Sequence, residues 1–345
     1  MAISQVDYFF LFVLSYVLVG LLTPVIRKIA LAQGVLDRPN SAHKSHKNPV
    51  PYLGGVAIII GVVIVSYIAL ILKTFTWNNF WLATSVLGPA IAMGLVGMWD
   101  DIKNLNPLPR FIGQSIAGIV VAIILMLTDT VGNPTGVTVL DVAITFLWIV
   151  GICNSINFFD NLDGGAAGTV AITAISLTYL AITGDQYFIA ALSIVVAGST
   201  LGFLIWNRAP ARIYMGDAGA LFLGLLIATL TVRFKPSTDS SVSSFAIPVL
   251  LLAIPILDTT VAVFSRLRRN VSPFQGGKDH LSHRLVRAGL SRKLSAIALW
   301  SLTGLFSFFA VLISLPNNGH EIIIILISSV FWILLFISFF RTKDN

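Results

Sequence analysis

The chain has 345 residues, of which 56% are hydrophobic and only 11% are charged, and its mean hydropathy is +0.90. A soluble domain carries about 25% charged residues, so this composition excludes a soluble globular protein and predicts an all-α polytopic membrane protein. The single cysteine, Cys153, excludes an internal disulfide, and the formal net charge of +7 is informative mainly through its distribution.

Apolar stretches of about 20 residues, the length of a membrane-spanning helix, recur along the whole chain. We treat residues 1–345 as one integral membrane domain. The first apolar run lacks a preceding basic region and a small-residue cleavage site, so we interpret it as a retained span rather than a signal peptide. We expect eleven spans, near 8–26, 53–72, 81–99, 110–128, 139–157, 166–183, 187–206, 216–233, 244–264, 294–315 and 321–340.

The positive charges predict an orientation for these spans. With eleven spans, all Lys and Arg residues except Lys73, Arg233 and Lys235 fall on one side of the membrane. The positive-inside rule makes that side cytoplasmic, with the N-terminus outside and the C-terminus inside a plasma membrane. The polar clusters lie on the same side, so we expect a cytoplasmic active-site cleft.

The first polar cluster with a clear chemical signature is the pair Asp100-Asp101, where the third span ends, with Lys103 close behind. Adjacent carboxylates repel each other and need a cation or a shared proton between them. The alternative is a solvated helix end without a chemical role.

The densest polar cluster lies between the fifth and sixth spans, at Asn154–Gly165, and reads N-S-I-N-F-F-D-N-L-D-G-G. Asp160 and Asp163 stand there with the amides of Asn154, Asn157 and Asn161. A capped turn would need one or two such residues. Five in ten residues at the edge of a membrane span favour a functional site.

The segment Asn207–Asp217 reads N-R-A-P-A-R-I-Y-M-G-D and precedes the eighth span. Asp217 alone is consistent with an N-cap. However, arginines such as Arg208 and Arg212 hold phosphate well, and an aromatic side chain such as that of Tyr214 can stack on a base. Gly216 allows backbone to approach a ligand closely.

The segment Ser272–Leu285 reads S-P-F-Q-G-G-K-D-H-L-S-H-R-L. His280 and His283 share one face if the segment is helical. Structural zinc needs four ligands, and neither Cys nor Glu is near, so a phosphate- or sugar-binding pair fits better, with Arg266, Arg268 and Arg269 upstream. Asp258 lies within the ninth span, and its role is left open.

Carboxylates beside many cations at a membrane surface indicate a reaction class. Oxygen ligands suit Mg²⁺, which binds through one or two carboxylates together with substrate phosphates. Basic side chains together with Mg²⁺ are typical of enzymes that transfer phosphoryl groups, in which positioning and charge stabilisation supply most of the catalysis. The membrane location implies that one substrate is a lipid.

These residues resemble the polyprenyl-phosphate N-acetylhexosamine-1-phosphate transferases, glycosyltransferase family 4. The resemblance covers nearly the whole chain. It is carried by the motifs D-R-P-N at 37–40, H-K-N-P-V-P-Y-L-G-G at 46–55, D-D-I-K at 100–103, N-S-I-N-F-F-D-N-L-D-G at 154–164, N-R-A-P-A-R-I-Y-M-G-D at 207–217, P-I-L-D-T at 255–259 and H-L-S-H at 280–283.

The resemblance implies ten or eleven helices, a homodimer as one plausible assembly, and transfer of a sugar-1-phosphate from a UDP-sugar to a polyprenyl phosphate, with release of UMP. The cofactor would be Mg²⁺, with Mn²⁺ as a substitute, and no nucleic acid would be bound. The implied metal ligands are Asp217 and Asn157. The implied catalytic residues are Asp100, Asp101, Asp160, His280 and His283, and the implied substrate contacts are Lys47, Asp163, Asn207, Arg212, Tyr214 and Arg266.

The segment around 280–283 also indicates the donor sugar. The muramoyl-pentapeptide branch of the family carries three adjacent histidines followed by a glutamate, and this chain lacks that run. It resembles instead the branch that uses UDP-GlcNAc to start teichoic acid, O-antigen or similar glycans on undecaprenyl phosphate. The pattern of that branch is H-x-H-H, and Ser282 replaces one of its histidines, so another UDP-sugar, including UDP-MurNAc-pentapeptide, is the alternative.

Two choices stay open at this point. The acceptor phosphate can attack the donor's β-phosphorus directly, which we favour, or a covalent aspartyl-phosphate can form first. A lipid-sugar carrier is the rival from a different class, but it would place charges near the middle of the membrane, whereas these charges fall at span ends. The arrangement of CDP-alcohol phosphotransferases, with Asp-Gly, Ala-Arg and two further Asp residues on consecutive helices, is not found in this sequence.

Overall fold

The computed structural model describes residues 4–37, 49–73, 75–103, 107–132, 134–236, 240–272, 277–315 and 319–342. Nearly all of its regular structure is helical, which confirms the predicted all-α class. The elements are α1 Gln5–Ala32, β1 Leu36–Asp37, β2 Val50–Pro51, α2 Gly54–Lys73, α3 Trp77–Lys103, α4 Pro107–Leu127, α5 Thr138–Phe159, α6 Gly165–Thr183, α7 Tyr187–Asn207, α8 Gly216–Arg233, α9 Ser241–Leu251, α10 Ala253–Arg268, α11 Leu281–Arg287, α12 Arg292–Ile313 and α13 Glu321–Arg341.

Ten of the described helices are long and apolar enough to cross a membrane, and the pair α9 and α10 brings the number to eleven if it counts as one span. The predicted count is therefore confirmed, and the protein is a multi-pass membrane protein. The ninth span, expected over 244–264, is not one straight helix, because α9 and α10 meet at an angle of 73°. Pro255 explains the break: it has no N–H for the carbonyl of Leu251 and clashes with that turn.

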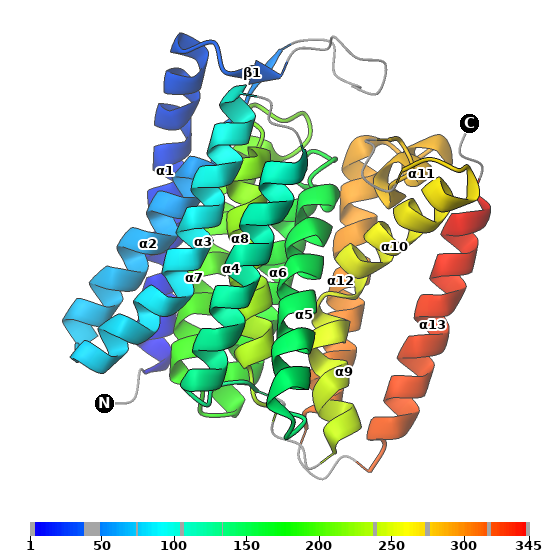
Figure 1. Cartoon of the computed structure of the whole chain (residues 1–345). Helices are drawn as coiled ribbons and strands as arrows, with labels where there is room; N and C mark the ends of the chain where they lie inside the picture. The colour runs from blue at the N-terminus through cyan, green and yellow to red at the C-terminus, as the bar shows by residue number, and fades with distance from the viewer. Residues whose placement is uncertain are drawn as a thin grey trace.

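The helices pack around α8, as Figure 1 shows, and α8 contacts α2, α3 and α5. In its apolar window 83% of the residues are buried, against 6% for α13, which stands at the edge of the bundle. Glycines make this central position possible. A Cβ on Gly219 would lie 2.6 Å from Cα of Gly55 in α2, and one on Gly224 would lie 2.9 Å from Cα of Cys153 in α5. Small residues of this kind let membrane helices approach closely.

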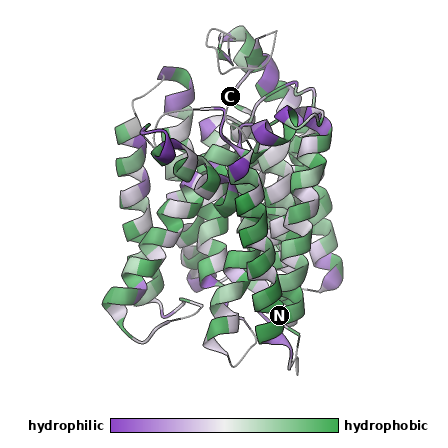
Figure 2. Ribbon diagram, turned by 90° about the vertical axis from the view of Figure 1, so that its right-hand side faces the viewer, coloured by the Kyte–Doolittle hydropathy of each residue, from purple (hydrophilic) through white to green (hydrophobic). Residues whose placement is uncertain are grey.

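Polar residues gather at one end of the bundle, which we call the polar end and which carries Asp100, Asp160, Asp217 and Asp279. Figure 2 shows hydrophilic segments concentrated there and hydrophobic ones along the length of the helices. The N-terminus lies at the opposite end and the C-terminus at the polar end (Figure 1), as an odd number of spans requires. Which end faces the cytoplasm stays a prediction.

A short hairpin marks the polar end. In it β1 pairs antiparallel with β2, with Leu36 opposite Pro51 and Asp37 opposite Val50. The chain between the two strands, 38–48, is outside the described residues, and so is the predicted substrate contact Lys47. Beyond β2, the N–H groups of Gly54 and Gly55 donate to the carbonyls of Tyr214 and Met215 at 3.0 and 2.8 Å. The start of α2 is thereby joined to the start of α8.

Candidate active site at the polar end

The first amides of α8 are the centre of the site. The N–H groups of Asp217 and Ala218 donate to the carboxylate of Asp101 at 2.9 and 3.1 Å. Asp101, at the end of α3, therefore caps α8, where free N–H groups and the helix dipole favour negative charge. The sequence interpretation of Asp217 as a cap is replaced by this arrangement: Asp101 caps the helix, and the side chain of Asp217 is available for other contacts.

Asp217 receives two side-chain donors from different helices. Nδ2 of Asn157 in α5 donates to its Oδ1 at 2.9 Å, and the guanidinium of Arg110 in α4 pairs with its Oδ2. Arg110 also pairs with buried Asp100 at 2.7 Å. One arginine thus bridges two carboxylates, and three of the predicted residues, Asp100, Asp217 and Asn157, are brought together.

The backbone around Asp217 tolerates no added side-chain atoms. Gly216 has φ +72°, a left-handed conformation that suits glycine, and a Cβ there would lie 2.5 Å from Oδ2 of Asp101. A Cβ on Gly97 of α3 would collide with the carbonyl of Asp217. The sequence suggested that Gly216 lets the backbone approach a ligand closely. In the structure, the group that approaches the backbone of Gly216 closely is the carboxylate of Asp101.

The loop after α5 brings two further carboxylates to the same end. Asp160 is the C-cap residue of α5. Burial, followed by the negative charges of Asp217, Asp101 and Asp163, raises its pKa well above the ordinary value. Asp163 is buried, accepts from the N–H of Ala211 at 3.0 Å and faces Arg292 at 3.6 Å. We call Asp100, Asp101, Asp160, Asp163 and Asp217 the acid cluster.

Asn207 joins the two loops that border the acid cluster. It is 1% exposed, its Oδ1 accepts from the N–H of Gly164, and its Nδ2 donates to the carbonyl of Ile213, both at 3.0 Å. These contacts occupy both ends of the amide. Asn207 thus holds the loop around Asp163 beside the loop around Tyr214, and its predicted contact with uridine stays a prediction.

Tyr214 lies at the edge of the site. Its ring is tilted against that of Tyr52, with 6.1 Å between the centroids, and burial followed by the charge of Asp163 raises the pKa of its hydroxyl. Arg212 is exposed and its guanidinium lies 5.6 Å from the ring of Trp206. An exposed guanidinium that packs on an indole ring remains accessible to an anion.

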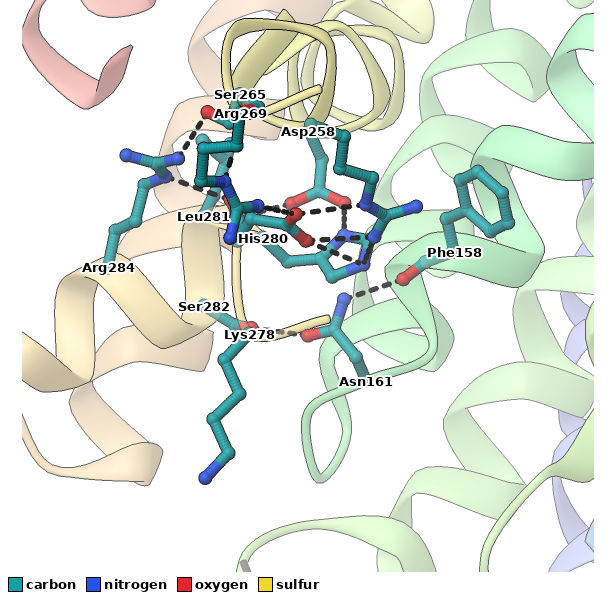
Figure 3. Close-up of polar contacts among 12 residues, drawn as sticks. Phe158, Asn161, Asp258, Ser265, Arg269, Lys278, His280, Leu281, Ser282 and Arg284 are labelled. Atoms are coloured by element: carbon teal, nitrogen blue, oxygen red, sulfur yellow. Dashed lines mark hydrogen bonds and ion pairs between the residues drawn. The ribbon is translucent and has the colours of Figure 1, made fainter. Parts of the chain in front are cut away.

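A second cluster lies where α10 meets α11, and Figure 3 shows its contacts. Arg266 binds Asp279 through two nitrogens, at 2.9 and 2.8 Å, and its Nη2 lies 3.2 Å from Nε2 of His280. Nδ1 of His280 lies 2.7 Å from the carboxylate of Asp258. We call Asp258, Arg266, Asp279 and His280 the histidine network, and all four residues are buried.

Ion pairs and hydrogen bonds surround this network. Burial opposes the negative charge of Asp279, but the hydrogen bonds and charge of Arg266 outweigh it and hold the pKa of Asp279 below its ordinary value. Arg284 donates to the carbonyl of Asp279 at 2.8 Å and to Ser265 at 2.6 Å. Burial lowers the pKa of His283 to about 4, so His283 is neutral at pH 7.

The end of α5 connects the acid cluster to the histidine network. Asn157 contacts Asp217, whereas the next residue, Phe158, lies under the guanidinium of Arg266 at 5.7 Å from ring centroid to Cζ. Asn161 donates to the carbonyl of Phe158 at 2.6 Å and accepts from Ser282 in α11 (Figure 3). One short segment, 157–161, therefore touches both clusters.

The acid cluster fits a divalent cation in its chemistry. It gathers oxygen donors whose mutual repulsion is seen in the raised pKa of Asp160. Among the residues that the structure describes, no three His, Cys, Asp or Glu side chains are placed to hold a metal by themselves. A cation shared between one or two protein groups and substrate phosphates does not need such a trio. Asp217 and Asn157 are the pair best placed for it.

Sequence reasoning missed several contributors to the site. It counted Arg110 and Arg292 only as topology signals, although Arg110 bridges Asp100 and Asp217. It left Asp258 open and assigned no role to Asp279. The available signal was position: Arg110 opens the span after Asp100-Asp101, and Asp279 directly precedes His280.

Comparisons with known proteins show what the chain is similar to. Residues 83–235 match the model of glycosyl transferase family 4. A probable undecaprenyl-phosphate N-acetylglucosaminyl 1-phosphate transferase of Bacillus subtilis is 33% identical over 327 residues, 93% of this chain and 88% of the relative. A decaprenyl-phosphate N-acetylglucosaminephosphotransferase of Mycolicibacterium smegmatis is 32% identical, with 83% of this chain and 77% of the relative covered.

A more distant relative is a phospho-N-acetylmuramoyl-pentapeptide-transferase of Halalkalibacterium halodurans, 27% identical over 87% of this chain and 94% of its own length. The family resemblance seen in the motifs is confirmed by these matches. With relatives above 30% identity along most of its length, the chain belongs to glycosyl transferase family 4, a family of enzymes.

Proposed function

We propose that the protein transfers N-acetylglucosamine-1-phosphate from UDP-GlcNAc to undecaprenyl phosphate, giving undecaprenyl-diphosphate-GlcNAc and UMP. The observation that carries the proposal is the constellation of Asp217, Asn157, Asp101 and Arg110 at the start of α8. It occurs in a chain whose relatives in Bacillus and Mycolicibacterium are named for polyprenyl-phosphate GlcNAc-1-phosphate transfer. This reaction would be the first membrane step of a cell-envelope glycan.

The reaction exchanges one phosphorus–oxygen bond for another. An oxygen of the acceptor phosphate attacks the β-phosphorus of the donor, and the bond from that phosphorus to the bridging oxygen breaks. The bridging oxygen leaves with UMP. Both reactants are anions, so their repulsion must be neutralised where they meet. Arg110, which already bridges two carboxylates, and Arg266 are the described cations best placed to do so.

Asp217 and Asn157 would hold Mg²⁺, with Mn²⁺ as a substitute. When bound, the ion supplies charge neutralisation at the donor pyrophosphate. Asp100 and Asp101, carried by the end of α3, would orient the acceptor, and Asp160 and Asp163 lie in the loop after α5. We favour direct attack by the acceptor phosphate, and a covalent aspartyl-phosphate is the alternative.

The donor contacts follow the family pattern. Tyr214 would stack on uracil, Asp163 and Asn207 would face the uridine, and Lys47 and Arg212 would meet phosphate. Arg266 would contact the pyrophosphate, and His280, whose two ring nitrogens face Arg266 and Asp258, would support it from behind. In the plasma membrane, the polar end would face the cytoplasm, where UDP-sugars are made, and the N-terminus would lie outside. A homodimer is consistent with the family resemblance.

UDP-MurNAc-pentapeptide is the second candidate donor, favoured by the relative from Halalkalibacterium. Residues 280–283 argue against it, since His280, Ser282 and His283 do not form three adjacent histidines. Moreover, the position after His283 is Arg284, whose side chain is bound to the backbone near the ends of α13 and α11.

The test is UMP release by purified protein with undecaprenyl phosphate, Mg²⁺ and one of the two donors. We expect release with UDP-GlcNAc and none with UDP-MurNAc-pentapeptide. Release with the muramoyl donor alone would overturn the assignment of the sugar but not the chemistry. No release with either donor, from folded protein, would turn attention to other UDP-sugars and then to a carrier.

A further inference from the structure

Asp258 is a carboxylate that the proposed reaction does not use. Its side chain is fully buried in α10, one oxygen lies 2.7 Å from Nδ1 of His280, and the other accepts from the N–H of Leu281 at 2.7 Å. The bend between α9 and α10 places it there (Figures 1 and 3). Both of its oxygens therefore hold the short segment in which His280 stands.

The partners of His280 determine where its ring proton must be. Arginine has only donors, so the contact between Nη2 of Arg266 and Nε2 of His280 requires Nε2 to accept. The ring proton then stands on Nδ1 and is donated to Asp258. The chain of contacts runs in one direction, with Arg266 donating to His280 and His280 donating to Asp258.

Arg266 is the first donor in this series of hydrogen bonds, and it lies beside the end of α5, which also contacts the acid cluster. Its guanidinium packs over Phe158, the residue after Asn157, and Asp279 holds it through two nitrogens. A change of tautomer at His280 would turn an N–H toward the donor group of Arg266. The two groups would then repel each other, and Arg266 would move away from Phe158.

We propose that Asp258 is a positioning residue: it holds His280 as the neutral tautomer with the proton on Nδ1, and through it holds Arg266 beside the donor's phosphates. This inference rests on the proposed function for its effect on turnover, but not for the tautomer. His280 then supports Arg266 rather than exchanging protons with substrate. The effect of Asp258 on Arg266 passes through His280.

The tautomer can be measured without any substrate. The chain has five histidines, so protein labelled with ¹⁵N-histidine in lipid nanodiscs gives few ring signals, and His280→Gln identifies the one of interest. We expect the wild-type ring to be neutral and protonated at Nδ1. A ring protonated at Nε2, or at both nitrogens, would overturn the proposal. Since the wild-type spectrum decides this point, a variant that fails to fold does not affect it.

The matched control is Asp141, another buried aspartate that accepts a backbone N–H, from Thr135 at 2.6 Å, in the first turn of α5. It stands at the start of α5, whereas the site uses the end of that helix. Asp141→Asn should leave the His280 signals unchanged. Asp258→Asn should shift them, because the amide cannot accept from both the ring and Leu281.

Kinetics provide the second test. Loss of a group that orients a functional side chain typically costs 10–100-fold, so we expect Asp258→Asn to lower kcat by about that factor, with the KM for undecaprenyl phosphate within about twofold. In a protein that already carries His280→Ala, Asp258→Asn should lower kcat by less than about twofold, because the imidazole through which Asp258 acts on Arg266 is already missing. Additive losses would overturn the proposal. If the wild type releases no UMP, the proposed function fails while the tautomer result stands.

Discussion

The acid cluster and the histidine network lie at the same end of the bundle but balance charge in opposite ways. In the histidine network each buried charge faces a partner: Arg266 faces Asp279, and Asp258 faces His280 and a backbone amide. In the acid cluster Arg110 pairs with Asp100 and Asp217, but the carboxylates still crowd one another, and the pKa of Asp160 is raised by burial and by Asp217, Asp101 and Asp163. The first region is therefore organised in advance, whereas we propose that the second is completed by a cation and substrate.

The largest expected effect comes from removing the carboxylate at the centre of the acid cluster. Asp217→Asn should reduce UMP release by about 10³-fold, since a group that stabilises charge in the reacting complex is worth about that much. Magnesium-induced thermal stabilisation should disappear with it. Asp141→Asn is the control and should retain both. Normal turnover in Asp217→Asn would show that the metal is held elsewhere.

A smaller effect is expected in the histidine network. Arg266→Lys keeps the charge but cannot make the two parallel hydrogen bonds to Asp279, so we expect a loss of about 10–100-fold in kcat/KM for the UDP-sugar. Magnesium-induced stabilisation should persist in this variant. Loss of the magnesium-induced stabilisation in Arg266→Lys would mean that the acid cluster and the histidine network do not act separately.

Asp160→Asn should stabilise the protein in the absence of metal. A raised carboxyl pKa means that the folded state holds a proton that the unfolded state releases, so Asp160 lowers stability as pH rises above about 4. The variant should melt about 2 °C higher at pH 7 and show a smaller stabilisation by Mg²⁺. A lower melting temperature would indicate that Asp160 is paired with a cation rather than crowded by acids.

His283 should produce the smallest change, with the opposite pH dependence. Its pKa is lowered from 6.5 to about 4, so the unfolded state takes up a proton first, and stability falls as pH drops through this range. The wild type should lose about 1–2 °C more than His283→Gln between pH 7 and 5. Equal pH profiles would show that His283 is solvated in solution.

The sequence was sufficient to predict what depends on local composition. Hydropathy located the spans because a helix that crosses the hydrocarbon core needs about 20 mostly apolar residues and must satisfy its backbone hydrogen bonds internally. The motifs placed Asp100, Asp217 and Asn157 together, and the structure joins two of them to the same arginine and the third to Asp217. The bend at 252 escaped prediction, because averaged hydropathy does not register that Pro255 has no N–H for the carbonyl of Leu251, which accepts instead from the hydroxyl of Thr173 at 2.9 Å.

The remaining site residues depend on geometry that no window of sequence contains. Asp258 reaches His280 across 22 residues only because α10 tilts away from α9. Arg110 reaches Asp217 across 107 residues, because α4 packs beside α3 and α8. In both cases the residue type was visible in the sequence, but its partner was determined by how helices pack.

The bend between α9 and α10 also has a consequence for the surrounding bilayer. The 11 residues of α9 are about 16 Å long. The 16 residues of α10, inclined by 73°, add only about 7 Å along the direction of α9. The sum is clearly less than the roughly 30 Å of a hydrocarbon core. We therefore expect the bilayer to be thinner beside this pair than elsewhere around the bundle, which would bring lipid headgroups closer to the level of α10.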